Sequence, residues 1–257
     1  MALINTAALV LKNVPFQETS SIVRFFTRSQ GKISVIAKGA RRLKSAFRGY
    51  LEPLNLVELI YYYKPTREIQ TLSKIELIQA LFRNVSEFTD SMYAMAVIEC
   101  IDKFVIDHHR DEAVFDHAVE VLRCMDGQPG HLHAPLLYFL SGMTQLLGYG
   151  LSLEECGICN RPLRKAIYNS ASGQLLCEDC GHYAEHFQTL GVEDTETLRK
   201  LNRMQTISDL STLTIDEHDF KIVRFLVYYI AQHLEIRSKV KSIEMLMNMR
   251  SVDGDQE

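Results

Sequence analysis

Hydrophobic and polar residues alternate in short runs along the first third of the chain. These runs are rich in β-branched and aromatic side chains, and turn-forming residues separate them. They predict five strands, at Ala7–Leu11, Ser21–Thr27, Lys32–Ala37, Leu54–Tyr63 and Ile69–Ile78. Because five short strands fall within about 80 residues, the pattern favours a small closed barrel.

From about residue 81 the hydrophobic period becomes that of helices. Apolar residues three or four positions apart predict helices at about 92–105, 114–125, 136–147, 195–204, 220–234 and 241–249. Residues 151–190 interrupt this pattern and predict a small inserted module. We therefore expect an α+β protein, with a barrel at residues 1–80 and an all-α helical domain at 81–257 that carries the module.

Two barrels fit the predicted strands. The five-stranded OB-fold binds single-stranded nucleic acid across one face and its loops. An SH3-like barrel also has five strands, and the pattern does not exclude it. No apolar run approaches the roughly 18 to 20 residues that span a bilayer, and the first residues lack the basic region of a signal peptide. We expect a cytoplasmic protein that makes no membrane contact.

Charge is distributed unevenly along the chain. The net charge is -4, yet residues 1–80 hold twelve Lys or Arg against five Asp or Glu, which leaves the remainder strongly acidic. Residues 19–51 contain eight basic residues and no acidic one. A basic first third joined to an acidic body predicts a head that binds nucleic acid and a body with another role.

The basic stretch is the leading candidate binding site. Its cations suit a phosphate backbone, Gly39 lets the backbone approach a ligand, and Phe47 and Tyr50 can stack on unpaired bases. The alternative is a solvated positive face without a ligand, but such faces usually mix both signs of charge. The candidate DNA-binding residues are Arg24, Lys32, Lys38, Gly39, Arg41, Arg42, Lys44, Phe47 and Arg48.

Four cysteines have the spacing of a metal site. Cys156, Cys159, Cys177 and Cys180 form a C-x2-C-x17-C-x2-C pattern, typical of tetrahedral zinc. Redox dithiols and paired disulfides are the alternatives, and a cytoplasmic setting argues against disulfides. Four thiolates fill the tetrahedron, so we expect one structural zinc ion per chain. Either His182 or His186 can in principle replace a cysteine, and we treat both as surface or outer residues.

Motifs of catalysis are missing from the sequence. It contains no GxxxxGK[ST] phosphate loop, no GxSxG and no HExxH. Asp107-His108-His109 is similar to a phosphoesterase motif, but no Asp-rich strand ends precede it. We expect a solvated helix end there instead. The sequence therefore predicts a protein that is not an enzyme.

Several motifs together resemble the bacterial RecO family of recombination mediators. They are the run Gly31–Arg42, the run Gly49–Leu54, the two cysteine pairs and the ending His233–Ser242. The similarity covers nearly the whole chain in order. Glu235 departs from the family pattern, because the family usually has glycine at that position.

The resemblance implies a function that composition and spacing do not show. It implies an OB-fold that binds single- and double-stranded DNA, anneals complementary strands, and works with single-stranded-DNA-binding protein and RecR to load RecA. It places the protein in the bacterial cytoplasm, associated with the nucleoid. By position, the residues that match the basic family run are Lys38, Arg41, Arg42, Lys44 and Arg48, and the four cysteines match the zinc-bearing members.

Two functions of other classes compete with this one. A metal-dependent nuclease or deaminase would use the cysteine cluster, but a zinc deaminase needs an H-x-E motif ahead of P-C-x-x-C, and the sequence has neither. An RNA-binding or transcription-linked adaptor with the same barrel stays open.

Overall fold

The computed structural model describes residues 2–82, 87–128, 131–182, 187–215 and 220–253. The chain forms two compact units. The first, here called the barrel unit, comprises Met1–Gly130 and Val240–Val252; the second, the cysteine unit, comprises His131–Lys239 and Asp253–Glu257. None of the helices in the described ranges is both long and apolar enough to cross a membrane.

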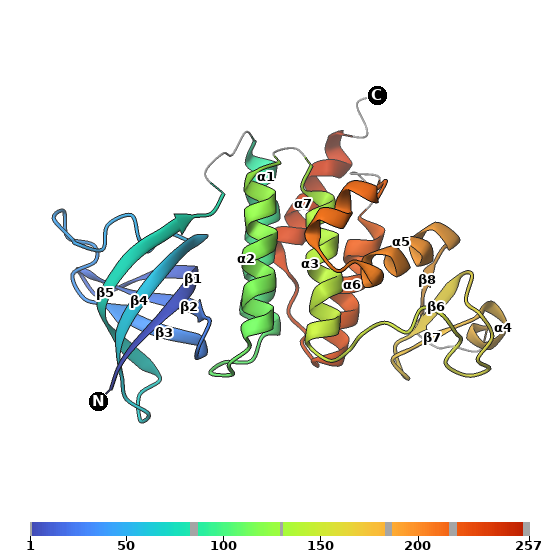
Figure 1. Cartoon of the computed structure of the whole chain (residues 1–257), viewed down its shortest axis with the longest axis horizontal. Coiled ribbons are helices and arrows are strands. Elements are labelled where there is room, and N and C mark those ends of the chain that lie inside the picture. Colours follow the sequence, from blue (N-terminus) through green and yellow to red (C-terminus); the bar gives the residue numbers. More distant parts are fainter. Residues whose placement is uncertain (1, 83–86, 129–130, 183–186, 216–219, 254–257) are drawn as a thin grey trace. The chain divides into compact units, whose positions relative to one another are not determined.

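Five strands close into the barrel in the order β1-β2-β3-β5-β4 (Figure 1). Their bounds are β1 Ala2–Phe16, β2 Ser20–Thr27, β3 Gly31–Ala37, β4 Asn55–Tyr63 and β5 Ile69–Ala80. Neighbouring strands are antiparallel, except that β3 and β5 pair in parallel through three residue pairs and close the barrel. This arrangement confirms the predicted OB-fold.

The first strand is longer than predicted. Its residues 2–9 pair with β4, and its residues 8–16 pair with β2. A register shift between Val10 and Lys12 bends the strand from one neighbour to the other. Pro15 was expected to lie beyond the strand, but it pairs with Ser21 of β2 in the half that β4 does not reach. A proline is tolerated there because its missing N–H leaves no gap in a second ladder.

Alternating side chains of all five strands fill the barrel. Val10, Phe25, Val35, Leu59 and Tyr61 are among the core residues with no exposed surface. The burial patterns of β3 and β4 alternate along much of their length, as expected for strands with one face inward. Alternation in the sequence therefore located the core.

Three helices complete the barrel unit: α1 Phe88–Phe104, α2 Glu112–Asp126 and α7 Lys241–Asp253. Helix α2 packs on the barrel, where the rings of Phe115 and Phe26 lie 5.6 Å apart. The carboxylate of Glu99 on α1 accepts hydrogen bonds from the backbone N–H groups of Lys241 and Ser242, at 2.9 and 2.8 Å. A side chain from α1 thus caps the first turn of α7.

The cysteine unit combines helices with a small sheet. Its helices are α3 His133–Leu146, α4 Glu178–Gly181, α5 Val192–Arg203 and α6 Lys221–His233, with a 3-10 turn at Ile207–Thr212. The strands β6 Ala166–Asn169, β7 Gln174–Leu176 and β8 Phe187–Leu190 form a sheet in the order β7-β6-β8. The predicted hairpin between the cysteine pairs is the β6–β7 pair, and β8 adds a strand that the sequence pattern did not predict.

Candidate nucleic-acid interface and metal centre

Residues 38–50 between β3 and β4 form a loop of consecutive turns, here called the basic loop. Gly39 and Gly49 near its two ends have φ angles of +72° and +81°, in the left-handed region that favours glycine. Short backbone hydrogen bonds run along it, from Arg42 N–H to the Gly39 carbonyl at 3.1 Å and from Ser45 N–H to the Arg42 carbonyl at 3.0 Å. The loop is therefore a structured turn series and not an extended strand.

The barrel holds the basic loop near both ends. The backbone N–H of Arg41 donates to the Thr19 carbonyl at 2.9 Å, and the side-chain amide of Asn55 donates to the Gly49 carbonyl at 2.8 Å. Phe47 and Tyr50 are half-buried and pack against the barrel core. Part of each of these two rings is thus occupied inside the chain, which leaves only the outer part for stacking on bases.

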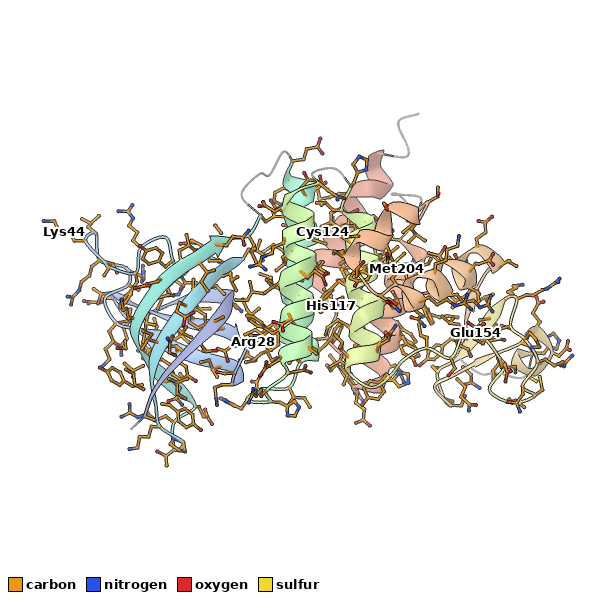
Figure 2. All side chains as sticks on the ribbon, viewed as in Figure 1. Arg28, Lys44, His117, Cys124, Glu154 and Met204 are labelled. Atoms are coloured by element: carbon orange, nitrogen blue, oxygen red, sulfur yellow. The ribbon has the colours of Figure 1, made fainter. Side chains whose placement is uncertain are left out.

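The cations of the basic loop are exposed and have no acidic partners among the described residues, although the Arg41 guanidinium donates to the Gln17 carbonyl at 3.2 Å. All five are exposed, and no carboxylate in the described ranges forms an ion pair with any of them: Lys38, Arg41, Arg42, Lys44 and Arg48. Figure 2 shows Lys44 on the side of the barrel away from α1 and α2. The loop therefore offers uncompensated positive charge to an external anion.

Arg24 and Lys32 lie in a different environment. The guanidinium of Arg24 donates to Asp102 and, at 2.6 Å, to Asp107, and the ammonium of Lys32 lies 3.1 Å from Asp107. Lys32 is only 3% exposed. Nearby, Arg28 pairs with Asp116 of α2 at 2.9 Å, and Figure 2 shows Arg28 between the barrel and α2. The positive charges of Arg24, Arg28 and Lys32 are thus neutralised by carboxylates of the same chain.

The segment that follows α1 packs tightly on the barrel. His108 N–H donates to the Lys32 carbonyl at 3.1 Å, and a Cβ atom on Gly31 would lie 2.0 Å from the carbonyl oxygen of His109. Residues 106–110 are exposed, as expected for a solvated helix end, but their backbone also contacts Gly31 and Lys32 of β3. The Asp107 carboxylate points at barrel cations, so the motif serves to join the helices to the barrel.

Opposing effects set the charge states in this cluster. Burial raises the pKa of Asp107, but hydrogen bonds from Arg24 and Lys32 and the charges of these two residues lower it by more. The pKa of Asp107 therefore lies below its usual value. Burial lowers the pKa of the Lys32 ammonium more than its acidic partners raise it. The carboxylate is therefore stabilised by the cluster, whereas the lysine carries a desolvation penalty that its partners offset only in part.

The structure places the predicted DNA-binding residues in two different environments. The loop cations lie with Gly39 and Phe47 on the basic loop, while Arg24 and Lys32 are held by acids 70 or more positions away in the chain. Sequence reasoning missed this division because no local pattern relates residues of β2 and β3 to the end of α1. A DNA-binding role for Arg24 and Lys32 stays a prediction.

The four predicted ligand cysteines converge in the cysteine unit. Their sulfur atoms all lie within 4.8 Å of one another, and Cys159 Sγ is 3.7 Å from Cys177 Sγ. Zn–S bonds of about 2.3 Å in a tetrahedron separate the sulfurs by about 3.8 Å. The cluster thus has the dimensions of a tetrahedral thiolate site. Among the described residues His182 is not part of it, and His186 lies outside the described residues.

The surroundings of the cluster favour the thiolate of Cys159 and the neutral thiol of Cys180. The backbone N–H and the guanidinium of Arg161 donate to Cys159 and lower the pKa of its thiol to about 6. The cation is itself fixed by an ion pair with Asp179 at 2.8 Å. Hydrogen bonding with Cys159 and Cys177 raises the pKa of Cys180 to about 12. The neighbouring sulfurs thus compete for protons, a competition that a divalent cation would relieve by binding all four as thiolates.

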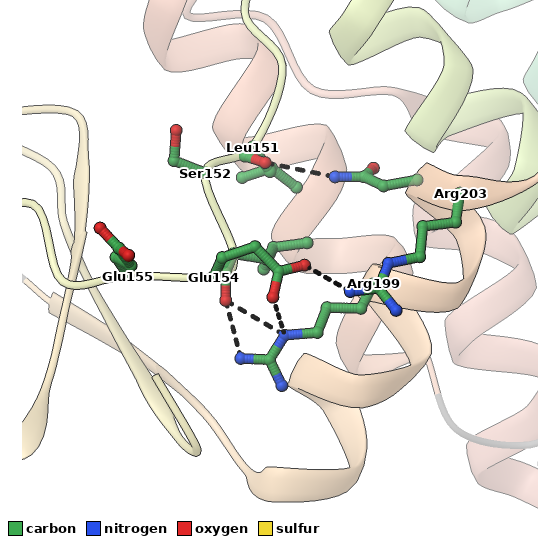
Figure 3. Close-up of a pocket in the computed structure, with 8 residues that line it drawn as sticks. Leu151, Ser152, Glu154, Glu155, Arg199 and Arg203 are labelled. Atoms are coloured by element: carbon green, nitrogen blue, oxygen red, sulfur yellow. Dashed lines mark hydrogen bonds and ion pairs between the residues drawn. The ribbon is translucent and has the colours of Figure 1, made fainter. Parts of the chain in front are cut away.

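A pocket of about 300 Å³ lies where the segment leading into the cysteine module meets α5. Figure 3 shows Arg199 and Arg203 projecting from α5 toward Glu154. Arg203 and Glu154 form an ion pair at 2.8 Å, and Arg199 donates to the Leu153 carbonyl at 2.7 Å. Leu151 and Leu153 supply apolar lining. The pocket thus combines two guanidinium groups with apolar surface, and one carboxylate of the chain already lies between the guanidinium groups.

Comparison with known proteins gives a consistent result along the chain. Residues 1–81 match the family model described as recombination protein O N terminal, and residues 85–242 match the model recombination protein O C terminal. A DNA repair protein RecO of Koribacter versatilis is 31% identical over 245 residues, covering 93% of this chain and 96% of the relative. Its counterpart in Rhodopirellula baltica is 31% identical over 199 residues, covering 76% and 73%, and that in Syntrophobacter fumaroxidans is 29% identical over 258 residues, covering 96% and 98%.

Proposed function

The chain belongs to the RecO family of DNA repair proteins, and we propose that it acts as a recombination mediator. In this role it binds single- and double-stranded DNA, anneals complementary strands, and helps to load RecA onto single strands coated by single-stranded-DNA-binding protein. The mediator carries out no bond-making chemistry and works in the bacterial cytoplasm, associated with the nucleoid. Repair and recombination follow from the family; annealing and RecA loading are the proposal.

The observation that carries the proposal is the basic loop. Five exposed cations, with no acidic partner in the described part of the chain, lie within thirteen residues on a loop that the barrel holds in place. Positive charge of this kind binds phosphates and releases counterions, with little dependence on base sequence. An annealing protein needs this property, because it must bind any strand while leaving the base edges free to pair.

Replacing the loop cations tests the assignment. We expect the quadruple variant Lys38→Ala, Arg41→Ala, Arg42→Ala, Lys44→Ala to bind single strands weakly at low salt and to anneal slowly. Each lost phosphate contact reduces the log-log salt slope by about 0.7, so four contacts account for about 3. The barrel should stay folded, since these four side chains are exposed and the exposed hydrogen bond from Arg41 to the Gln17 carbonyl contributes little to stability.

A charge-matched control separates the loop from net charge. It carries four exposed cations of the cysteine unit changed to alanine: Arg164, Lys200, Arg224 and Arg237. We expect wild-type affinity and slope from it, measured by fluorescence anisotropy across a salt series. If the loop variant kept both the affinity and the slope of the wild type, the DNA-binding assignment would be wrong. Competition between RNA and single-stranded DNA addresses the alternative, an RNA-binding adaptor, which requires RNA to win.

We propose that the cysteine cluster holds one structural zinc ion. Cys156, Cys159, Cys177 and Cys180 would supply four thiolates, and the ion would tie the two cysteine pairs together without an open position for substrate. The sulfur separations support this assignment. Metal analysis of protein purified without chelator should give one zinc per chain, and finding none would refute the site.

We also propose that the helical domain at residues 81–257 binds RecR and single-stranded-DNA-binding protein. For the acidic tail of the latter, the pocket beside Arg203 is the proposed position, because a tail carboxylate can take the place of Glu154 in an exposed ion pair that itself contributes little to stability. We expect Arg203→Glu in the full chain to weaken binding of the tail peptide at least tenfold in calorimetry. Arg224→Glu, an exposed arginine on α6, is the control. Equal affinity of the two variants would exclude the pocket.

A further inference from the structure

Leu43 has the most exposed large apolar side chain in the described part of the chain, at 89%. It lies between Arg42 and Lys44, in the middle of the basic loop. An exposed leucine is ordinary when it stands alone on a mixed surface. Leu43 differs because cations flank it on both sides and nothing acidic in the described ranges pairs with them.

The loop holds this leucine away from the barrel. Its two ends are tied down through Arg41 and Gly49, while the aromatic side chains of Phe47 and Tyr50 pack toward the core. The loop therefore directs its aromatic groups inward and its aliphatic group outward. An exposed leucine lowers the solubility of a loop that binds no ligand, whereas it can contribute apolar contact when the loop binds a partner.

We propose that Leu43 inserts between neighbouring bases of bound single-stranded DNA and unstacks them. This inference rests on the proposed function of the basic loop. If Arg42 and Lys44 contact neighbouring phosphates, the exposed Leu43 side chain lies within reach of the bases that those phosphates join. Apolar side chains are known to open base steps in this way. An opened step would present bases singly to an incoming complementary strand.

An anionic membrane is the competing partner, since an apolar residue among cations also suits a lipid surface. One leucine buries far less apolar surface than a stable membrane anchor requires, and Phe47 and Tyr50 are engaged with the barrel core. The observations therefore favour DNA, and vesicles serve as one arm of the test.

The test uses the full-length protein with Leu43→Ala, and with Leu43→Met as a variant that keeps the apolar volume. The probe is single-stranded DNA that contains 2-aminopurine, whose fluorescence rises when its neighbours unstack. We expect wild type and Leu43→Met to raise this fluorescence and Leu43→Ala to lose the rise. Affinity should fall about tenfold in Leu43→Ala with an unchanged salt slope, because apolar burial is lost and phosphate contacts are not. The control is Leu3→Ser, which removes another exposed leucine of the barrel.

Each other outcome contradicts the insertion of Leu43 between bases. Wild-type affinity and fluorescence in Leu43→Ala would overturn it and leave the proposed function intact. Weaker binding with an undiminished fluorescence rise would show that Leu43 only supports the loop. Binding to phosphatidylglycerol vesicles that disappears in Leu43→Ala would identify a membrane as the partner instead. If the quadruple cation variant also bound DNA normally, the proposed function of the basic loop would be wrong, and so would the insertion of Leu43 between bases.

Discussion

Removing the two members of the Lys32–Asp107 ion pair one at a time should have unequal effects on stability. Asp107→Asn removes the carboxylate that accepts hydrogen bonds from both Arg24 and Lys32. The Lys32 ammonium, 3% exposed, then keeps its hydrogen bond to the Asp102 carbonyl and the weaker attraction of the Asp102 carboxylate, but its nearest carboxylate has become a neutral amide. Lys32→Met instead removes the buried charge and fills its volume, while Asp107 keeps Arg24. We expect Asp107→Asn to be clearly the more destabilising change.

The magnitudes follow from burial. Stranding one member of a buried ion pair costs about 3 to 5 kcal/mol. The Asp107 side chain is 48% exposed, so water compensates part of this loss, and we expect about 2 kcal/mol. That corresponds to a fall in melting temperature of about 4 to 8 °C. Replacing the lysine by an apolar residue of similar volume should change stability by less than about 1 kcal/mol, because its desolvation penalty disappears together with the pair.

Urea and thermal unfolding followed by circular dichroism measure both variants and the double variant. Asp107→Asn should cost less in the Lys32→Met background than alone, which is the signature of direct coupling. Equal destabilisation by the two single changes would refute the reasoning. Loss of DNA affinity in folded Lys32→Met would show that Lys32 contacts DNA, as the sequence predicted.

Three further changes probe other parts of the chain. Because the pKa of Asp107 is lowered in the folded state, its ionised carboxylate stabilises the protein at pH values above the usual carboxyl pKa, and this stabilisation is lost as the pH falls through the folded pKa. Below about pH 4, the melting temperature should therefore fall less with pH in Asp107→Asn than in the wild type. Cys177→Ser should reduce bound zinc and the melting temperature while DNA affinity in anisotropy stays unchanged, and a variant that kept its zinc would contradict the ligand assignment. Gly31→Ala should unfold at a markedly lower temperature than Gly49→Ala. Both glycines have a positive φ, but only the new Cβ at residue 31 would collide with a backbone oxygen, that of His109. Equal melting temperatures of the two variants would count against this packing.

The sequence predicted those parts of the fold that local patterns encode. Alternation located all five barrel strands because one face of each is buried, and the spacing of the cysteine pairs located a cluster whose sulfurs converge. The full length of β1 escaped prediction, since Pro15 ends most strands and only the pairing partner shows that it is tolerated here. β8 was missed because four residues carry too little periodicity.

The candidate site was predicted in composition but not in arrangement. The spacing of charges identified the basic loop, yet it could not distinguish Lys44, which is free of acidic partners in the described ranges, from Lys32, which acids neutralise. That distinction depends on contacts between residues 70 or more positions apart. Similarly, Phe47 looked available for stacking because the sequence does not show which ring face the core covers.

The capping of α7 by Glu99 has a consequence for how the protein is made. The barrel unit is discontinuous, so its last helix leaves the ribosome only after residues 131–239 have been synthesised. At about 5 to 20 residues per second, α1 waits roughly 7 to 27 seconds for that partner. During this interval the intervening unit can complete its own folding, while the surface that receives Val240, Ile243 and Leu246 stays uncovered. The nascent chain is therefore most open to chaperones, or to pairing with the wrong neighbour, at the helices of the barrel unit.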